Sequence, residues 1–165
     1  MNVEIKEYLN RSREIQNYLL QFFEQDENTE ENYQQIIDFF ISYRIEEKKN
    51  ELKEILNLIV KICNNHHKTP AFYNKVQKII LYFQDSIKKF YCNSDIFNIF
   101  KSNKKLLLFL FQSKLLIPDN YIANSITQKK YEKFNYCHFF YPEFRDFEKF
   151  KKYSTFYENT KDFEA

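Results

Sequence analysis

Apolar residues recur at steps of three and four along most of this chain, the spacing that places side chains on one face of an α-helix. The first run predicts a helix of about 20 residues, which the polar segment 25–32 ends. Its apolar positions are Ile5, Tyr8, Leu9, Ile15, Leu19 and Phe22. A second helix is predicted after Thr29, whose hydroxyl can cap free backbone NH groups. Its apolar positions are Tyr33, Ile36, Ile37, Phe40 and Ile41.

Two further long helices are predicted, a third at 47–65 and a fourth at 70–91. The fourth has the clearest apolar face. This face comprises Phe72, Val76, Ile79, Ile80, Phe83, Ile87 and Phe90. The charged residues of the same segment fall outside that set, and they are Lys75, Lys78, Asp85 and Lys89.

The stretch ICNNHHKTPAF, residues 62–72, carries signals for a helix end followed by a helix start. Asn64 and Asn65 are the best available residues for a left-handed helix end in a chain without glycine. Thr69 can then cap the fourth helix, with Pro70 at the first helical position, where its missing NH costs nothing. We therefore interpret this stretch as a connection between helices.

Residues 94–119 predict a pair of short helices. Ser94 and Asp95 open the first, KSNKK turns the chain, and residues 106–111 form the second before LLIPD leaves it. An ankyrin repeat has this same order of elements. The turn glycine, the T-P-L-H opening and a second copy at a period of about 33 residues are missing, so we interpret the segment as a degenerate ankyrin-like pair.

Residues 64–122 resemble the N-terminal helical region of large ankyrin-repeat protein families of trichomonad protists. They read NNHHKTPAFYNKVQ…IFNIFKSNKKLLLFLF…IPDNYI. The resemblance is carried by Asn-Asn-His-His before a basic residue, Thr and Pro, by the block IFNIFKSNK, and by the Leu and Phe run. It extends loosely over residues 1–145. It implies an intracellular, solenoid-like helical domain that binds proteins or caps a repeat array, and it transfers no catalytic residue.

The chain contains no glycine, although average usage of about 7% would give roughly a dozen. A P-loop, a dinucleotide fingerprint, a nucleophile elbow and an EF-hand loop each need glycine where the backbone turns tightly. No convergent nucleophile, base and orienting group can be named either. We therefore expect no enzyme activity and no cofactor. Tight β-hairpins also rely on glycine, so the absence of glycine favours an all-α fold.

Cys63, His66 and His67 are the candidate ligands for a zinc site, with Cys137 and His138 as a distant second pair. Neither C-x2-C nor H-x3-H spacing occurs, and adjacent histidines do not converge on one ion without special backbone geometry. The two histidines are also explained by the connection between helices, where protonated imidazoles suit the negative end of a helix. We therefore expect no metal.

Charge and hydropathy limit the kinds of partner that the chain is expected to bind. The 25 Lys and Arg against 23 Asp and Glu give a net charge of +2, which demands neither a polyanion nor a membrane surface. The longest apolar run, residues 106–111, is far shorter than the ~20 residues that span a bilayer. Three cysteines and a charged start without an apolar leader lead us to expect an intracellular, cytoplasmic chain with free thiols.

An aromatic-rich tail follows, with 12 Phe or Tyr among the 27 residues 131–157. Aromatic residues there step by three, which lags the helix by about 60° at each step, so they cannot share one core-facing stripe. Three interpretations stay open: rings that wrap the core, stacking surfaces for nucleic acid, and anchors for a protein partner. The predicted partner-binding residues are Phe144, Phe147, Phe150 and Tyr153.

Together these patterns predict an all-α single domain over residues 1–165, a helical bundle or solenoid-like array of about six to eight helices. Its parts are four long amphipathic helices in 1–91, the helix pair, and a helical tail in 120–165. The predicted function is a non-catalytic protein-protein interaction or repeat-capping module associated with ankyrin-type repeats. The alternative is a small helical nucleic-acid-binding protein, and self-association stays open.

Overall fold

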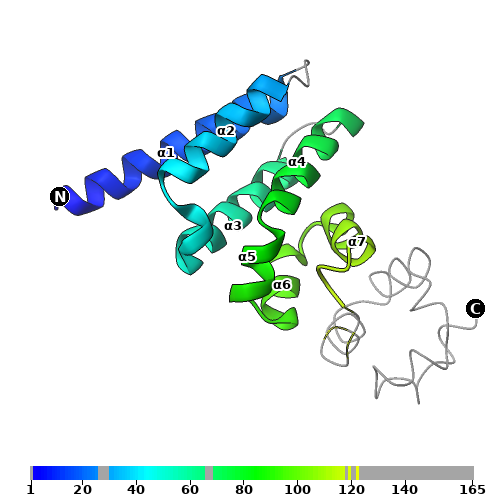
Figure 1. Cartoon of the computed structure of the whole chain (residues 1–165). Helices are drawn as coiled ribbons and strands as arrows, with labels where there is room; N and C mark the ends of the chain where they lie inside the picture. Colours follow the sequence, from blue (N-terminus) through cyan, green and yellow to red (C-terminus); the bar gives the residue numbers. More distant parts are fainter. Residues whose placement is uncertain (1, 26–29, 66–68, 118, 120–121, 123–165) are drawn as a thin grey trace, which may run out of the picture. The chain divides into compact units, whose positions relative to one another are not determined.

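The computed structural model describes residues 2–25, 30–65, 69–117, 119 and 122 (Figure 1). Within them it contains seven α-helices, one short 3-10 helix and no strand, so the predicted all-α fold is confirmed. The helices are α1 (Val3–Glu24), α2 (Glu30–Ser42), α3 (Lys49–Asn65), α4 (Pro70–Tyr82), α5 (Gln84–Phe90), α6 (Asn93–Phe100) and α7 (Lys104–Gln112), with the 3-10 helix η1 at Ile45–Glu47. The chain divides into two compact units, Met1–Phe90 and Tyr91–Ala165. The prediction of a single domain stays a prediction.

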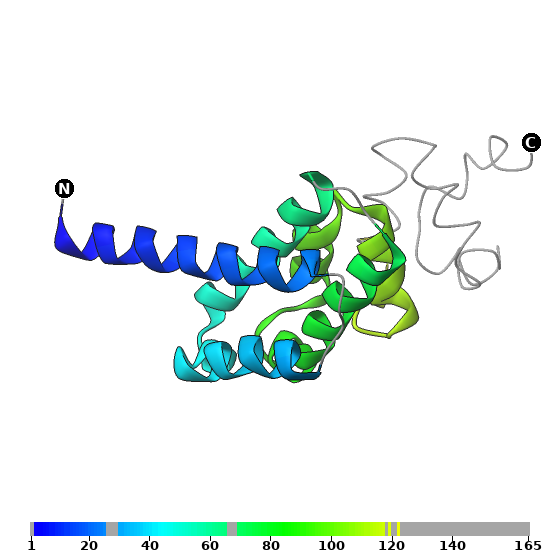
Figure 2. The same ribbon diagram turned by 90° about the horizontal axis from the view of Figure 1, so that it is seen from above.

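The first unit is built around α1, which packs against α2, α3 and α4 (Figures 1 and 2). Each of these helices contributes one apolar stripe to a shared core, as their three-and-four spacing requires. Fully buried members are Leu19, Phe40, Leu52, Leu56, Ile59, Val76, Ile79 and Ile80. Residues separated by more than 50 positions therefore share one core.

The connection before α4 confirms one of its two predicted signals. The backbone NH of Phe72 donates to Oγ1 of Thr69 at 3.2 Å, and Pro70 occupies the first turn. The prediction of a left-handed helix end at Asn64 and Asn65 is wrong, because both residues belong to α3. Among the described residues positive φ angles occur at Arg44 and Lys114 instead.

The single helix predicted over residues 70–91 is interrupted at Phe83, which has φ −88° and ψ 6°. Its backbone NH is shared between the carbonyls of Ile79 and Ile80, at 3.4 and 3.1 Å, a tightening typical of the end of a helix. The Phe83 side chain is fully buried, and its ring centroid lies 4.9 Å from that of Phe40. The apolar face is therefore continuous across the interruption, which is why periodicity did not detect it.

Lys75 departs from its expected position outside the apolar face, because it is only 2% exposed. Its ammonium donates to the carbonyl of Phe22 at 3.0 Å and also to the carbonyl of Gln25, both at the C-terminal end of α1. The last carbonyls of a helix lack intrahelical partners and carry the negative end of its dipole. Lys75 is therefore a buried cap that α4 supplies to α1.

The second unit contains the predicted helix pair, as α6 and α7. Asn103 caps α7 by accepting from the NH of Leu106 at 3.0 Å. The pair is closed by Asn93, whose side chain donates to the carbonyl of Ile117 at 2.6 Å and accepts from its NH at 2.9 Å. The predicted pair of short helices is therefore present, and the segment that follows it is hydrogen-bonded back to the start of α6.

No helix in the described part of the chain has the length and apolarity to cross a membrane.

Candidate functional site

The N-terminal half of α1 is an exposed helix. No residue from Val3 to Asn10 is buried, and Figure 2 shows this half extending beyond α2 and α3. Three of its apolar side chains lie on one side of the helix, namely Ile5, Tyr8 and Leu9, with 51%, 50% and 42% of their surface exposed. We call these three residues the bare face of α1.

The bare face belongs to the same stripe that forms the core. Ile5, Tyr8 and Leu9 precede Ser12, Ile15 and Leu19 at steps of three and four. Ile15 is 7% exposed and Leu19 is fully buried. One apolar stripe therefore begins in solvent and ends in the core, and Ser12 stands where the two parts meet.

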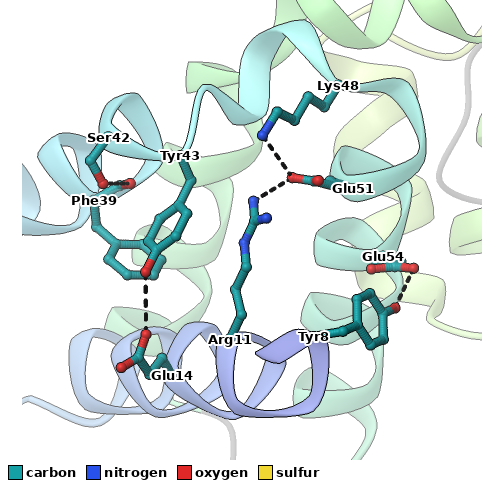
Figure 3. Close-up of polar contacts among 9 residues, drawn as sticks. All are labelled: Tyr8, Arg11, Glu14, Phe39, Ser42, Tyr43, Lys48, Glu51 and Glu54. Atoms are coloured by element: carbon teal, nitrogen blue, oxygen red, sulfur yellow. Dashed lines mark hydrogen bonds and ion pairs between the residues drawn. The ribbon is translucent and has the colours of Figure 1, made fainter. Parts of the chain in front are cut away.

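Two polar contacts attach the exposed half of α1 to α3 (Figure 3). Arg11 donates to Oε2 of Glu51 at 2.5 Å, and Lys48 lies 3.7 Å from the same oxygen. Tyr8 donates its hydroxyl proton to Oε1 of Glu54 at 2.5 Å. Since Glu51 and Glu54 lie one turn apart on α3, the two contacts fix the direction in which α1 leaves the core.

A second set of contacts joins α1 to the end of α2. The guanidinium of Arg11 lies 4.5 Å from the ring centroid of Tyr43, a cation-π contact. The hydroxyl of Tyr43 donates to Oε2 of Glu14 at 3.3 Å (Figure 3). Arg11 thus lies between α2 and α3, and it ties the exposed helix to both.

A small pocket of about 200 Å³ opens beside these contacts, between α1 and α3. Ile15, Ile55 and Leu58 give it an apolar lining. The remaining lining residues are Tyr8, Arg11, Ser12, Gln16, Glu51 and Glu54. Pockets for drug-sized ligands measure roughly 300 to 1,000 Å³, so this smaller pocket suits one side chain better than a cofactor.

The hydrogen bond to Glu54 raises the pKa of Tyr8 above its ordinary value, and partial desolvation adds to the effect. A phenol that donates to a carboxylate loses that bond on ionisation, and its own negative charge then faces another one. Tyr8 therefore stays a neutral donor at physiological pH, and its ring stays in place at the edge of the pocket.

The predicted partner-binding residues Phe144, Phe147, Phe150 and Tyr153 lie outside the described residues, so this prediction stays a prediction. Among the zinc ligands considered, Cys63 is buried in α3. His66, His67, Cys137 and His138 lie outside the described residues. Within the part of the chain that the structure describes, no group of three or more His, Cys, Asp or Glu side chains is placed to hold a metal ion.

Apolar spacing places Tyr8 on one face of the first predicted helix, but it does not predict the contacts of Arg11, Glu51 and Glu54. Arg11 and Glu51 are 40 positions apart, and Tyr8 and Glu54 are 46 apart. Local periodicity carries no information about pairing over that separation. The polar residue Ser12 in the middle of the stripe was the one local signal that the face changes its environment there.

The described residues thus define an all-α protein in which one helix presents an open apolar face. No protein-family model, curated protein or solved structure matches the chain.

Proposed function

We propose that this chain is a non-catalytic protein-interaction module that binds a protein partner through the bare face of α1. The supporting observation is the continuation of the core stripe into solvent at Ile5, Tyr8 and Leu9. Single exposed apolar residues are common on protein surfaces, but adjacent ones on a projecting helix are typical of contact sites. An amphipathic helix offers its partner anchors at these same spacings.

The polar groups beside the bare face support binding over catalysis. Tyr8 and Arg11 are engaged by Glu54 and Glu51, so each carboxylate neutralises or orients a neighbour. This arrangement holds a surface in a fixed geometry, which lowers the entropy lost when a partner binds.

The resemblance of residues 64–122 supports the finer part of the proposal, a location beside ankyrin-type repeats and a role in capping them in the cytoplasm. The pair α6 and α7 agrees with it in the order of its elements. Sequencing the reading frame beyond the chain tests this part: repeats of about 33 residues should follow. A frame without repeats contradicts the capping role and leaves the bare face unaffected.

The main proposal is tested by affinity capture from cells that produce the chain, followed by reconstitution. We expect a captured protein, once purified, to bind the wild type and to lose at least tenfold in affinity with Ile5→Glu. The matched control is Asn10→Glu, which adds the same charge to the exposed half of α1 on the opposite side. Purified partners that bind all three proteins equally contradict the proposal.

A further inference from the structure

We propose that the bare face of α1 binds the same face of a second copy of this chain, with the two helices antiparallel. This inference rests on the proposed function and identifies the partner. Symmetric dimers need a patch that is complementary to itself, so that residue i meets residue j and j meets i. The exposed half of α1 carries both members of two complementary pairs, one apolar and one charged.

The apolar pair is an exposed side chain and a pocket on one side of one helix. Ile5 is 51% exposed, and Ser12, two turns further on, lines the pocket between α1 and α3. In an antiparallel pair, a two-fold axis between Tyr8 and Leu9 places residues whose numbers sum to 17 opposite each other. Ile5 of each copy then meets Ser12 of the other, beside the pocket that Ser12 helps to line.

The same axis brings Tyr8 of one copy beside Tyr8 and Leu9 of the other. All three side chains of the bare face are therefore covered by a single operation. Tyrosine suits this central position, since its ring buries a large area at low entropy cost while its hydroxyl keeps its bond to Glu54.

The charged pair agrees with this register. Glu4 and Arg11 lie two turns apart on one flank of the bare face. In the same register Arg11 of one copy lies on the same flank as Glu4 of the other, about two residues away along the helix axis, which a long side chain can span. Arg11 already binds Glu51 through one nitrogen, but a guanidinium has five N–H donors and can serve further carboxylates. A parallel pair would instead place Glu4 beside Glu4 and Arg11 beside Arg11.

The size of the surface sets the expected affinity. The stretch from Val3 to Ser12 covers about 15 Å of helix at 1.5 Å per residue. Such a contact is at the small end of specific interfaces. On the other flank Lys6 and Arg13 bring like charges near each other, which weakens it further. We expect a dissociation constant on the order of 10 µM.

Sedimentation equilibrium of the full chain, from about 1 to about 500 µM, tests the proposal because this range brackets the expected constant. The wild type should pass from monomer to dimer. Ile5→Glu and Leu9→Glu should each weaken dimerisation at least about 30-fold, because each change occurs twice in a symmetric contact. Asn10→Glu, which alters the opposite side, should leave the constant within about twofold. Circular dichroism before each run verifies that the variants keep their helicity.

The register has its own test, the variant Glu4→Lys. An antiparallel dimer loses two attractive contacts and gains repulsion, so it should weaken about fivefold or more at low salt, and less at high salt. A parallel dimer exchanges one like-charge contact for another and should not weaken, which would overturn the antiparallel arrangement.

A monomer throughout the concentration range, or a dimer that all α1 variants leave unchanged, overturns the inference. Neither result bears on whether a different protein binds the bare face, because the reconstitution experiment with a purified partner measures that separately. Conversely, a dimer that Ile5→Glu disrupts, with no other partner sensitive to this variant, supports the second copy as the partner.

Discussion

The two halves of α1 have the same helical conformation and the same apolar spacing but opposite environments. In the second half Ile15, Leu19, Phe22 and Phe23 are buried, where α1 packs against α2, α3 and α4. From Val3 to Asn10 every residue is exposed. The difference shows that a three-and-four pattern states which residues share a face, whereas burial depends on what other parts of the chain supply to cover it.

The largest expected contrast is between two leucines on the same stripe, Leu19 and Leu9. Leu19→Ala should lower the free energy of unfolding by about 2 to 5 kcal/mol, because it opens a cavity around a fully buried side chain. Leu9→Ala should change it by less than about 0.5 kcal/mol, because Leu9 is 42% exposed in the monomer. Urea unfolding at a concentration where the chain is monomeric measures both. Equal losses would mean that the two halves do not differ.

The next contrast concerns the end of α1 that lies in the core. Lys75→Met keeps the aliphatic stem but removes the donor to the carbonyls of Phe22 and Gln25. We expect a loss of about 1 to 3 kcal/mol, the cost of leaving buried acceptors unsatisfied. Lys78→Met is the control, since it removes a solvent-accessible ion pair with Glu30 and a cation-π contact with the ring of Tyr33. Its expected loss is below about 1 kcal/mol in the same unfolding experiment.

A smaller effect should follow from loosening the exposed half. Arg11→Met removes the contacts to Glu51 and to the ring of Tyr43. We expect faster hydrogen exchange of the amides between Val3 and Asn10 and a loss in global stability of about 1 kcal/mol or less. Arg13→Met, two residues further on and exposed, is the control and should leave both nearly unchanged. If both variants speed exchange alike, Arg11 does not hold the helix.

The smallest expected effect is a dependence on alkaline pH. The pKa of Tyr8 in the folded chain lies above its value near 10 in the unfolded chain, chiefly because Tyr8 donates to Glu54. The contribution of this bond to stability is therefore complete below pH 10, and it is lost as the pH rises through the raised pKa. Glu54→Ala should lower the pKa of Tyr8 toward 10. NMR titration of labelled tyrosines, assigned with Tyr8→Phe, measures the shift, and an unchanged pKa would exclude Glu54 as its cause.

Local signals in the sequence were sufficient for most helices and for the start of α4. The pair α6 and α7 and the cap at Thr69 are encoded by residues within a few positions of one another. The interruption at Phe83 was not predictable from apolar spacing, because the face that Phe83 extends is continuous. The burial of Lys75 could not be predicted either, since its partners are carbonyls 50 and 53 positions earlier.

The candidate surface shows the same limit. Ile5, Tyr8 and Leu9 were correctly placed on one face, but their exposure depends on where α3 ends its contact with α1. That point is set by pairs such as Arg11 with Glu51, which are distant in sequence. Apolar spacing therefore cannot distinguish a binding face from a core face, because both show the same pattern of residues.

The left-handed residues Arg44 and Lys114 have φ angles of 53° and 61° in a chain without glycine. A residue with a β-carbon pays about 1 to 2 kcal/mol of steric strain in this conformation. The same β-carbon restricts the backbone in the unfolded ensemble, so less conformational entropy is lost on folding. Lys114→Gly would relieve the strain at the end of α7 and at the same time enlarge the unfolded ensemble. In a chain without glycine, part of the free-energy cost of the turns is therefore steric strain in the folded state, and less of it is conformational entropy lost on folding.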